Sequence, residues 1–357
     1  CKLVQLETQP EASDMFNDSY AFITGTSQSM VNHFHNIADK LSQRLSWKDE
    51  SIVMEVGCND GSFLEQVKQY TQNTIGVEPS NNVAEIAREK GIEVYTEFFG
   101  SKFSGIANLE NKIDTIYAAN CICHIPDIND VFSTVEKLLS QNGYFVYEDP
   151  YLGSMISLGS FDQIYDEHVF LFSALSISYI ANMHDLELVN VEPQITHGGS
   201  MRYTIAHKGA KNISQNVIDL IKREKEIGLD KNHAYLNFTD SVDKIKNDLI
   251  ELLINLKNDG KKVVGYGATS KSTTVTNYFE ITPDLVECIY DTTPIKQNKY
   301  SPGAHIPVLP YDQFRDSNPD YVLLFAWNHA KEIMKKEIDF MGDQRHWIGY
   351  IPNVKVI

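Results

Sequence analysis

The chain has 357 residues, of which 42% are hydrophobic, so it contains enough apolar material for two compact domains. Its formal net charge is −17 at pH 7. Such an acidic chain is not expected to bind nucleic acid, because proteins that bind the phosphate backbone present basic surfaces. No stretch reaches the roughly 18 apolar residues of a membrane span and no secretory signal is visible, so we expect no membrane partner and a cytoplasmic location.

The cysteine pattern also favours a reducing compartment. The five cysteines form neither a disulfide framework nor a Cys-x-x-Cys pair. Cys121 and Cys123 stand two positions apart on a predicted strand, so we expect them to share one face and to pack in the core.

The first 45 residues are predicted to hold a short apolar lead-in, residues 1–12, followed by helical structure over residues 13–45. Phe34, Ile37 and Leu41 recur at helical spacing in this region. The polar and aromatic loop of residues 20–27 precedes these positions, and we expect it to lie over a ligand pocket.

Residues 51–62 predict a buried strand that runs into a glycine turn and then a helix. Residues 52–56 are mostly apolar, as a strand covered on both faces requires. Gly57 and Gly61 can adopt backbone angles closed to other residues, and they allow a ligand to approach the main chain. Helix N–H groups after Ser62 are expected to face that ligand.

Glu78 follows the next apolar run and stands 78 − 57 = 21 positions after Gly57. An acidic residue at about this offset binds ribose hydroxyls in doubly wound nucleotide-binding folds. The loop Glu55-x-Gly57-x-x-x-Gly61 lacks the denser glycine pattern that a pyrophosphate needs. It resembles motif I of the class I methyltransferases, which bind S-adenosylmethionine, although an ordinary strand–turn–helix is the alternative.

Further α/β units are expected to bring polar and aromatic residues to the same edge of a parallel sheet. A strand and its exit loop are predicted at residues 93–99, strands at 113–120 and 144–150, and helices at 83–90, 128–139 and 174–183. Ligands bind at the carboxyl edge of such sheets. The residues expected there are Phe98, Phe99, Asn120 and His124. Residues 187–192 and 200–206 are predicted to close the sheet as an antiparallel pair.

The stretch 161–173 has the most unusual chemistry in the chain. It places Tyr165, Glu167 and His168 within four positions, among apolar and aromatic neighbours. Polar, titratable side chains in such surroundings are candidates for acid–base work.

A second α/β unit is predicted after a charged helical segment, residues 208–258. Residues 263–271 again form a strand, a glycine loop and a helix start. The loop Gly265-x-Gly267-x-x-Ser270 is an incomplete dinucleotide fingerprint, and Lys271 is placed to balance the charge of a diphosphate. Strands are expected at 285–291 and 321–327.

Several ordered motifs resemble the sugar-nucleotide 3-C-methyltransferases, which build branched deoxysugars of the tetronitrose and mycarose kind. These motifs are Glu55–Gly61, Gly76–Glu85, Glu97–Gly100, Ala119–Asp127, Asp162–His168, Thr196–Ser200, Gly265–Ala268 and Pro302–Pro307. The resemblance implies an α/β protein in which a class I methyltransferase domain, residues 46–207, binds S-adenosylmethionine. It also implies a smaller Rossmann-like domain, residues 259–357, that holds a nucleoside-diphosphate-linked 4-keto-6-deoxy sugar.

The resemblance further implies a C-methylation at C3 through an enolate. His168 is the expected base, because the pKa of a histidine lies near the working pH. Glu167 is expected to orient it or to raise its basicity, and Tyr165 and Tyr20 to donate a hydrogen bond to the ketone or enolate oxygen. His124 is an alternative base or donor.

Binding residues carry over from the same resemblance. The cofactor is expected to contact Glu55, Gly57, Asn59, Gly61, Glu78, Phe98, Phe99 and Asn120. The sugar nucleotide is expected to contact Gly267, Ser270, Lys271, Lys296 and Asn328, with the stretch 290–296 as a weaker candidate. The family usually opens with a zinc domain built from four cysteines, and in this chain only Cys1 could correspond to one of them, the last, so no metal is predicted.

Two other functions are compatible with the sequence. A sugar O-methyltransferase would use the same cofactor and yield an ether, whereas an NAD-linked or non-catalytic sugar-nucleotide binder would use the second glycine loop. The sequence leaves open the nucleotide, the sugar, the stereochemistry and the oligomeric state.

Overall fold

The computed structural model describes residues 2–18 and 20–357, which divide into two compact units. Unit 1 comprises residues 1–151, 166–195 and 199–230, and unit 2 comprises residues 152–165, 196–198 and 231–357. Cys1, the only predicted counterpart of a zinc ligand, lies outside the described residues. The predicted linker 208–258 is divided at Asp230, so its first part belongs to unit 1 and its second part to unit 2.

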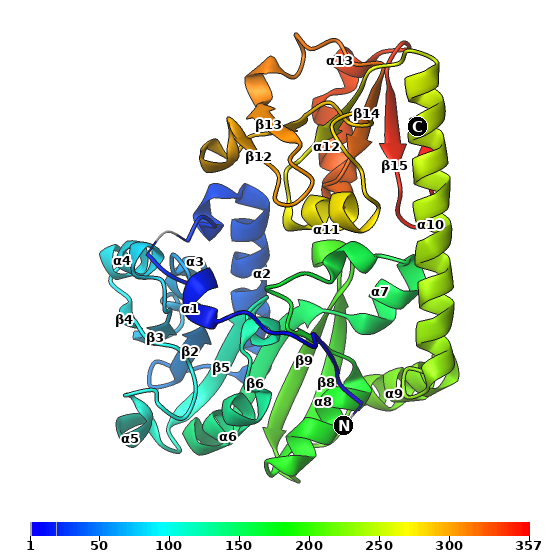
Figure 1. Ribbon diagram of the computed structural model, residues 1–357. Coiled ribbons are helices and arrows are strands. Elements are labelled where there is room, and N and C mark those ends of the chain that lie inside the picture. The colour runs from blue at the N-terminus through cyan, green and yellow to red at the C-terminus, as the bar shows by residue number, and fades with distance from the viewer. Residues whose placement is uncertain (1, 19) are drawn as a thin grey trace. The chain divides into compact units, whose positions relative to one another are not determined.

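Unit 1 is built on a sheet whose seven described strands follow the order β4–β3–β2–β5–β6–β9–β8 (Figure 1). These strands are β2 (Ile52–Val56), β3 (Asn73–Val77), β4 (Glu93–Tyr95), β5 (Ile113–Ala119), β6 (Leu139–Pro150), β8 (Leu186–Gln194) and β9 (Ser200–His207). Strands β2 to β6 are parallel, and β9 is antiparallel to both β6 and β8. The predicted doubly wound sheet with its antiparallel closing pair is therefore confirmed. Chain order reverses between β2 and β5, where ligands bind in such sheets.

The helices of unit 1 differ from the prediction mainly near the N-terminus. They are α1 (Ala12–Met15), α2 (Gln28–Leu45), α3 (Ser62–Val67), α4 (Asn81–Glu89), α5 (Ile106–Leu109), α6 (Ile128–Leu138), α8 (Ala174–Met183) and α9 (Gln215–Ile227). The predicted helical structure over 13–45 is wrong between α1 and α2. Helix α2 begins only at Gln28, because the Ser27 hydroxyl caps it by accepting from the Met30 N–H at 3.4 Å.

Short elements complete unit 1. They are the 3₁₀ turns η1 (Thr24–Thr26) and η2 (Ile122–His124) and the antiparallel pair β1 (Val4–Gln5) and β7 (Phe170–Leu171).

Alternation of side chains along the strands gives unit 1 two hydrophobic clusters. Val53 packs with Ile37 and Leu41 of α2, whereas the next residue, Met54, belongs to the cluster that contains Phe132 of α6. The central strands are thus covered on both faces, which is why they read as continuous apolar runs.

Unit 2 has its own sheet, whose seven described strands follow the order β12–β13–β11–β10–β14–β15–β16. They are β10 (Val263–Tyr266), β11 (Ile289–Asp291), β12 (Lys299–Tyr300), β13 (Pro307–Pro310), β14 (Tyr321–Leu324), β15 (His346–Gly349) and β16 (Lys355–Val356). Strands β13, β11, β10, β14 and β15 are parallel. Chain order reverses between β10 and β14, so this predicted Rossmann-like sheet is confirmed as well.

The helices of unit 2 are α7 (Leu152–Leu158), α10 (Asn232–Asn258), α11 (Ser270–Tyr278), α12 (Ala330–Lys336) and α13 (Ile338–Met341). Its 3₁₀ turns are η3 (Phe161–Gln163), η4 (Thr196–Gly198), η5 (Pro294–Lys296), η6 (Tyr311–Gln313) and η7 (Trp327–His329). The long helix α10, yellow-green in Figure 1, buries Leu249 and Leu253 in the same cluster as Val263 and Ile289 of the sheet. Every helix within residues 2–18 and 20–357 is too short or too polar to span a bilayer.

Candidate active site

In the glycine turn of unit 1, both the backbone conformation and the packing of neighbouring side chains require glycine. Gly57 has φ +69°, and its N–H donates to the Val77 carbonyl at 2.8 Å. A Cβ at this position would lie 2.6 Å from Cys121 Sγ. Gly61 has φ +74°, and a Cβ there would lie 2.5 Å from Ile92 Cδ1. Packing between neighbouring segments, in addition to any ligand, therefore fixes both glycines.

Glu78 stands at the carboxyl end of β3, as predicted, and the main chain fixes its carboxylate. Its Oε2 accepts the Asn59 N–H at 3.1 Å, and its Oε1 accepts the Ser80 N–H at 2.8 Å. Each carboxylate oxygen has a second lone pair. The group is thus held beside the glycine turn with acceptor capacity left for ligand hydroxyls.

Two further acceptors near this turn lack a partner among the described residues. Glu55 is buried on β2, and its Oε2 accepts no hydrogen bond there. Burial raises the pKa of Glu55, and the neighbouring carboxylates of Asp60 and Glu78 raise it further. Asn120, which follows β5 with φ +51°, likewise has an unpaired Oδ1. Such a site suits a cationic ligand that carries amino and hydroxyl donors.

The loop predicted to cover the pocket, residues 20–27, is hydrogen-bonded to the glycine turn. The Thr24 N–H donates to Asn59 Oδ1 at 3.0 Å, and the Gly25 N–H donates to Asp60 Oδ2 at 2.8 Å. Side chains of the turn therefore fasten this loop above it.

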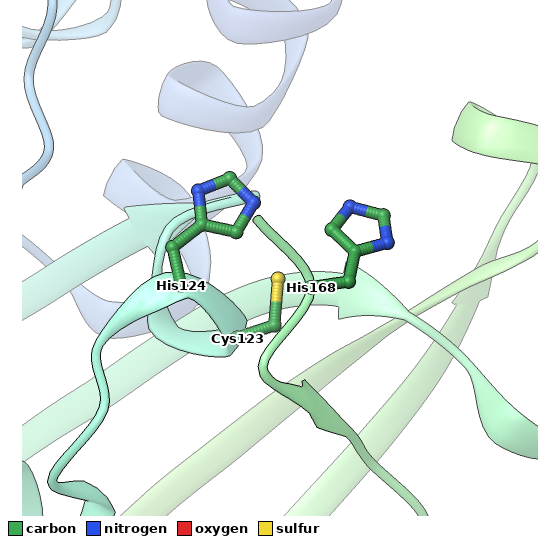
Figure 2. Close-up of side chains that lie close together, drawn as sticks. All are labelled: Cys123, His124 and His168. Carbon is green, nitrogen blue, oxygen red and sulfur yellow. The ribbon is translucent and has the colours of Figure 1, made fainter. Parts of the chain in front are cut away.

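Two histidines stack at the same edge of the sheet (Figure 2). His124 lies in η2, just beyond β5, and His168 precedes β7. Their ring centroids are 5.5 Å apart, with an angle of 20° between the planes. Phe16 also stacks on His124, at 5.7 Å and 13°. Because Cys121, three residues before His124, packs against Gly57, the stack lies close to the glycine turn.

The two imidazoles are buried, and this sets the charge of His124. Burial lowers the pKa of His124 to about 4, so its ring is neutral at neutral pH. Its Nε2 has no hydrogen-bond partner among the described residues. His168 is only 3% exposed. The structure thus brings together two of the predicted acid–base residues in a largely dry environment.

Tyr20 lies near this stack, with its ring centroid 5.5 Å from that of Phe16. Burial raises the pKa of Tyr20, and the carboxylates of Glu167 and Glu78 raise it further. The phenol therefore stays protonated and can donate a hydrogen bond. Tyr165, the other predicted donor, belongs to unit 2, and its role remains a prediction.

Cys123 lies beside the two histidines, as Figure 2 shows. Each of the three side chains offers one potential metal-ligand atom, and these atoms lie within 4.8 Å of one another. All three side chains are buried, and we assign none of them as a metal ligand. The expected shared strand face for Cys121 and Cys123 is wrong, because β5 ends at Ala119 and Cys123 lies in η2.

Asp149 was missed by the sequence analysis. It is fully buried near the end of β6, where its Oδ2 accepts the Cys123 N–H at 3.0 Å. Burial raises the pKa of Asp149 to about 8, so the acid is protonated at neutral pH. Its position after the apolar run 144–147, at the carboxyl edge beside Asn120, was the available signal.

The predicted aromatic pair separates into two environments. Phe98 is 47% exposed, whereas Phe99 is 6% exposed and packs near Phe103 in the core of unit 1. Core packing thus accounts for Phe99, and the adenine contact remains a prediction that suits Phe98 better.

In unit 2 the second glycine loop leads to a buried lysine. Gly267 has φ +89°, and α11 begins at Ser270 after the cap residue Thr269, whose hydroxyl accepts the Ser272 N–H at 3.1 Å. Lys271 is 6% exposed, and its ammonium makes no hydrogen bond to a described residue. Burial lowers the pKa of Lys271, and the attraction of a nearby carboxylate opposes this shift.

That carboxylate belongs to Asp162 of η3. Its Oδ2 accepts from Trp327 Nε1 and from the Tyr350 hydroxyl, both at 2.6 Å. Lys296 donates to the Ala268 carbonyl at 2.9 Å, which places its ammonium on the glycine loop. Ser270 is exposed, and Asn328 is half-buried in η7. The predicted substrate contacts of these residues remain predictions.

Comparisons with known proteins identify the family. A model described as "Methyltransferase domain" matches residues 31–191, and one described as "C-methyltransferase C-terminal domain" matches residues 195–352. C-methyltransferase NovU of Streptomyces niveus is 31% identical over 359 residues, which cover 100% of this chain and 85% of that protein. The chain belongs to the S-adenosylmethionine-dependent C-methyltransferases. The predicted fold, enzyme class and cofactor are thereby confirmed.

More distant similarities concern part of this C-methyltransferase. Sterol 24-C-methyltransferase ERG6 of Saccharomyces cerevisiae is 27% identical over 210 residues, which cover 56% of this chain and 48% of that enzyme. Magnesium protoporphyrin IX methyltransferase from Synechocystis PCC 6803, solved with bound S-adenosylmethionine, is 14% identical and has a TM-score of 0.38. The aligned region covers 50% of this chain and 82% of the solved chain.

Proposed function

We propose that this C-methyltransferase acts at C3 of a 4-keto-6-deoxy sugar linked to a nucleoside diphosphate. The observation that supports the proposal most directly is the buried stack of His124 and His168 at the edge of the sheet that carries the cofactor loop. Methylation at a carbon next to a ketone needs a base for a weakly acidic C–H, and a water-excluded imidazole provides one.

The residues of unit 1 fit the cofactor. The Glu78 carboxylate would accept the ribose hydroxyls, and Glu55 and Asn120 would use their unpaired oxygens to accept hydrogen bonds from the amino-acid end. The acidic surroundings also favour a positively charged ligand. When bound, S-adenosylmethionine supplies an electrophilic methyl group.

His168 is the base in this proposal. The 4-ketone acidifies the C3 proton, and the imidazole of His168 removes it. The proton then resides on that ring, and the negative charge passes to the ketone oxygen of the sugar. Because Tyr20 remains protonated, its hydroxyl can donate to that oxygen and stabilise the charge.

His124 contributes as a neutral partner. With a pKa of about 4 it does not compete for the proton under neutral conditions. It can instead fix the position of the ring stacked on it, or donate a hydrogen bond from its neutral N–H.

Deuterium exchange tests the proposal without the methyl transfer itself. The protein is incubated with a 4-keto-6-deoxy sugar nucleotide and S-adenosylhomocysteine in heavy water. We expect deuterium to enter at C3, and His168→Ala to slow its entry by roughly 10²–10⁴-fold, as for the loss of an acid–base group.

A matched control separates chemistry from folding. His233→Ala, at an exposed position of unit 2, is expected to exchange at the wild-type rate. Absence of both exchange and methyl transfer with dTDP- and GDP-linked substrates would reject the proposal. An ether product without exchange would indicate O-methylation instead.

A further inference from the structure

The glycine loops of the two units are built on the same main-chain hydrogen bond. The Gly57 N–H donates to the Val77 carbonyl at 2.8 Å, and the Gly267 N–H donates to the Tyr290 carbonyl, also at 2.8 Å. In each unit the glycine follows the strand beside the switch point, and the carbonyl lies on the neighbouring parallel strand. Gly57 and Gly267 are therefore structurally equivalent.

The same equivalence extends to a carboxylate. Glu78 directly follows Val77, and Asp291 directly follows Tyr290. Asp291 Oδ2 accepts the Ala268 N–H of the glycine loop at 2.7 Å, and its Oδ1 accepts the Thr293 N–H at 2.7 Å.

Glu78 is held in the same way. It accepts one N–H from its own glycine loop and one from the residue two positions later. Both carboxylates are buried, with Glu78 5% and Asp291 8% exposed, and each oxygen keeps one lone pair. A carboxylate fixed on such a loop is arranged to accept sugar hydroxyls.

The two sites differ in the charge next to the loop. Unit 1 has the buried acids Glu55 and Asp60 there, with the Lys90 ammonium 3.7 Å from Asp60 Oδ2. Unit 2 has Lys271 in the first turn of α11, where this buried ammonium lies in the field of Asp162 but donates no hydrogen bond to a described residue. An ammonium at a helix start suits a phosphate group.

From these observations we infer that Asp291 binds a free pentose hydroxyl of the nucleoside diphosphate, with Lys271 on the diphosphate. The inference rests on the proposed function and specifies how the nucleotide is held. It also gives the two carboxylates parallel tasks, Glu78 on the ribose of the cofactor and Asp291 on the pentose of the substrate.

Titration calorimetry with two kinds of probe tests the inference on the full chain. One probe is a nucleoside diphosphate, taken as the tightest of dTDP, UDP, GDP and CDP, and the other is inorganic pyrophosphate, which has no pentose. We expect Asp291→Asn to lower the affinity for the nucleoside diphosphate by roughly tenfold or more and to leave the affinity for pyrophosphate unchanged. Lys271→Met is expected to weaken both probes.

Controls exclude misfolding and simple charge effects. Asp316→Asn removes the same charge at an exposed position of unit 2 and is expected to change neither affinity. S-adenosylhomocysteine should bind all these variants as it binds the wild type, because its site lies in unit 1.

Three results would overturn the inference. They are equal binding of the nucleoside diphosphate by Asp291→Asn and the wild type, equal weakening of both probes by Asp291→Asn, and no binding of any nucleoside diphosphate by the wild type. The first two leave the proposed function intact, because C3 exchange is measured separately. The third, combined with absence of exchange, would overturn both.

Discussion

The two units treat buried acids differently at their ligand-binding edges. In unit 1 Glu55, Glu78 and Asp149 are buried without a salt bridge to a described residue, whereas Glu148, next to Asp149, pairs with Arg202 at 2.7 Å. In unit 2 Asp162 is equally buried, but it accepts two side-chain hydrogen bonds and lies in the field of Lys271. Similar folds thus leave three buried acids of one edge without a positive partner and place the buried acid of the other beside an ammonium, although burial still raises the pKa of Asp162.

The test with the largest expected effect replaces one buried acid of each unit by its amide. Asp149 keeps its proton up to about pH 8 in the folded state, whereas the ordinary pKa of an aspartic acid is 3.8. The unfolded chain releases that proton above pH 4, so the wild type loses stability as the pH rises toward 8. The free energy of unfolding of Asp149→Asn, measured relative to that of the wild type, should therefore increase by up to about 4 kcal/mol between pH 5 and pH 8.

Denaturant unfolding at several pH values measures this gain. Asp162→Asn is the counterpart, and we expect it to destabilise the protein at neutral pH, because Lys271 loses its balancing charge. Equal pH profiles for Asp149→Asn and the wild type would show that Asp149 is ionised in the folded protein, and the contrast between the units would fail.

The second test compares the two glycines. Gly57→Ala places a Cβ 2.6 Å from Cys121 Sγ in a left-handed conformation, whereas Gly267→Ala meets Ala326 Cβ at 3.1 Å. Both variants carry the strain of a left-handed backbone conformation, and overpacking adds mainly to Gly57→Ala. We therefore expect the free energy of unfolding to fall by about 3 kcal/mol for Gly57→Ala and by about 1.5 kcal/mol for Gly267→Ala. Thermal unfolding monitored by circular dichroism gives the ranking, and a reversed order would contradict the packing described for the unit 1 turn.

The smallest expected effect concerns the cofactor carboxylate. Glu78→Gln should weaken S-adenosylmethionine by roughly tenfold, because a charged acceptor of hydroxyl hydrogen bonds becomes neutral. Nucleoside diphosphate affinity should stay unchanged, which is the reverse of the pattern expected for Asp291→Asn. Glu89→Gln, at an exposed position of α4, is the matched control. Unchanged binding of the cofactor by Glu78→Gln would remove Glu78 from the site.

Local sequence signals predicted the scaffold of this protein well. Spacing along the chain was enough to predict the strand at 52–56, the glycine turn after it and Glu78 at the end of the next strand. These positions depend on residues that are close in sequence. The same reasoning placed Asn120 and His124 at the carboxyl edge. Tertiary contacts decide what spacing cannot, such as which of Phe98 and Phe99 enters the core.

Other features depend on residues far apart in the chain. The stack of Phe16, His124 and His168 joins three distant segments, and no single motif encodes it. The protonated state of Asp149 results from complete burial, which the sequence around it does not report. Helix α2 was placed too early because the apolar spacing of its core positions gave no sign of the Ser27 cap.

The interleaved course of the chain has a consequence for synthesis and engineering. Residues 152–165 and 196–198 belong to unit 2 but are made before unit 1 is complete, and the rest of unit 2 follows only after Asp230. A ribosome therefore releases Phe161, which is 5% exposed in the finished protein, long before its partners Phe279 and Val263 exist. Neither unit can be obtained intact by a single truncation, so swapping one of them between relatives requires several junctions.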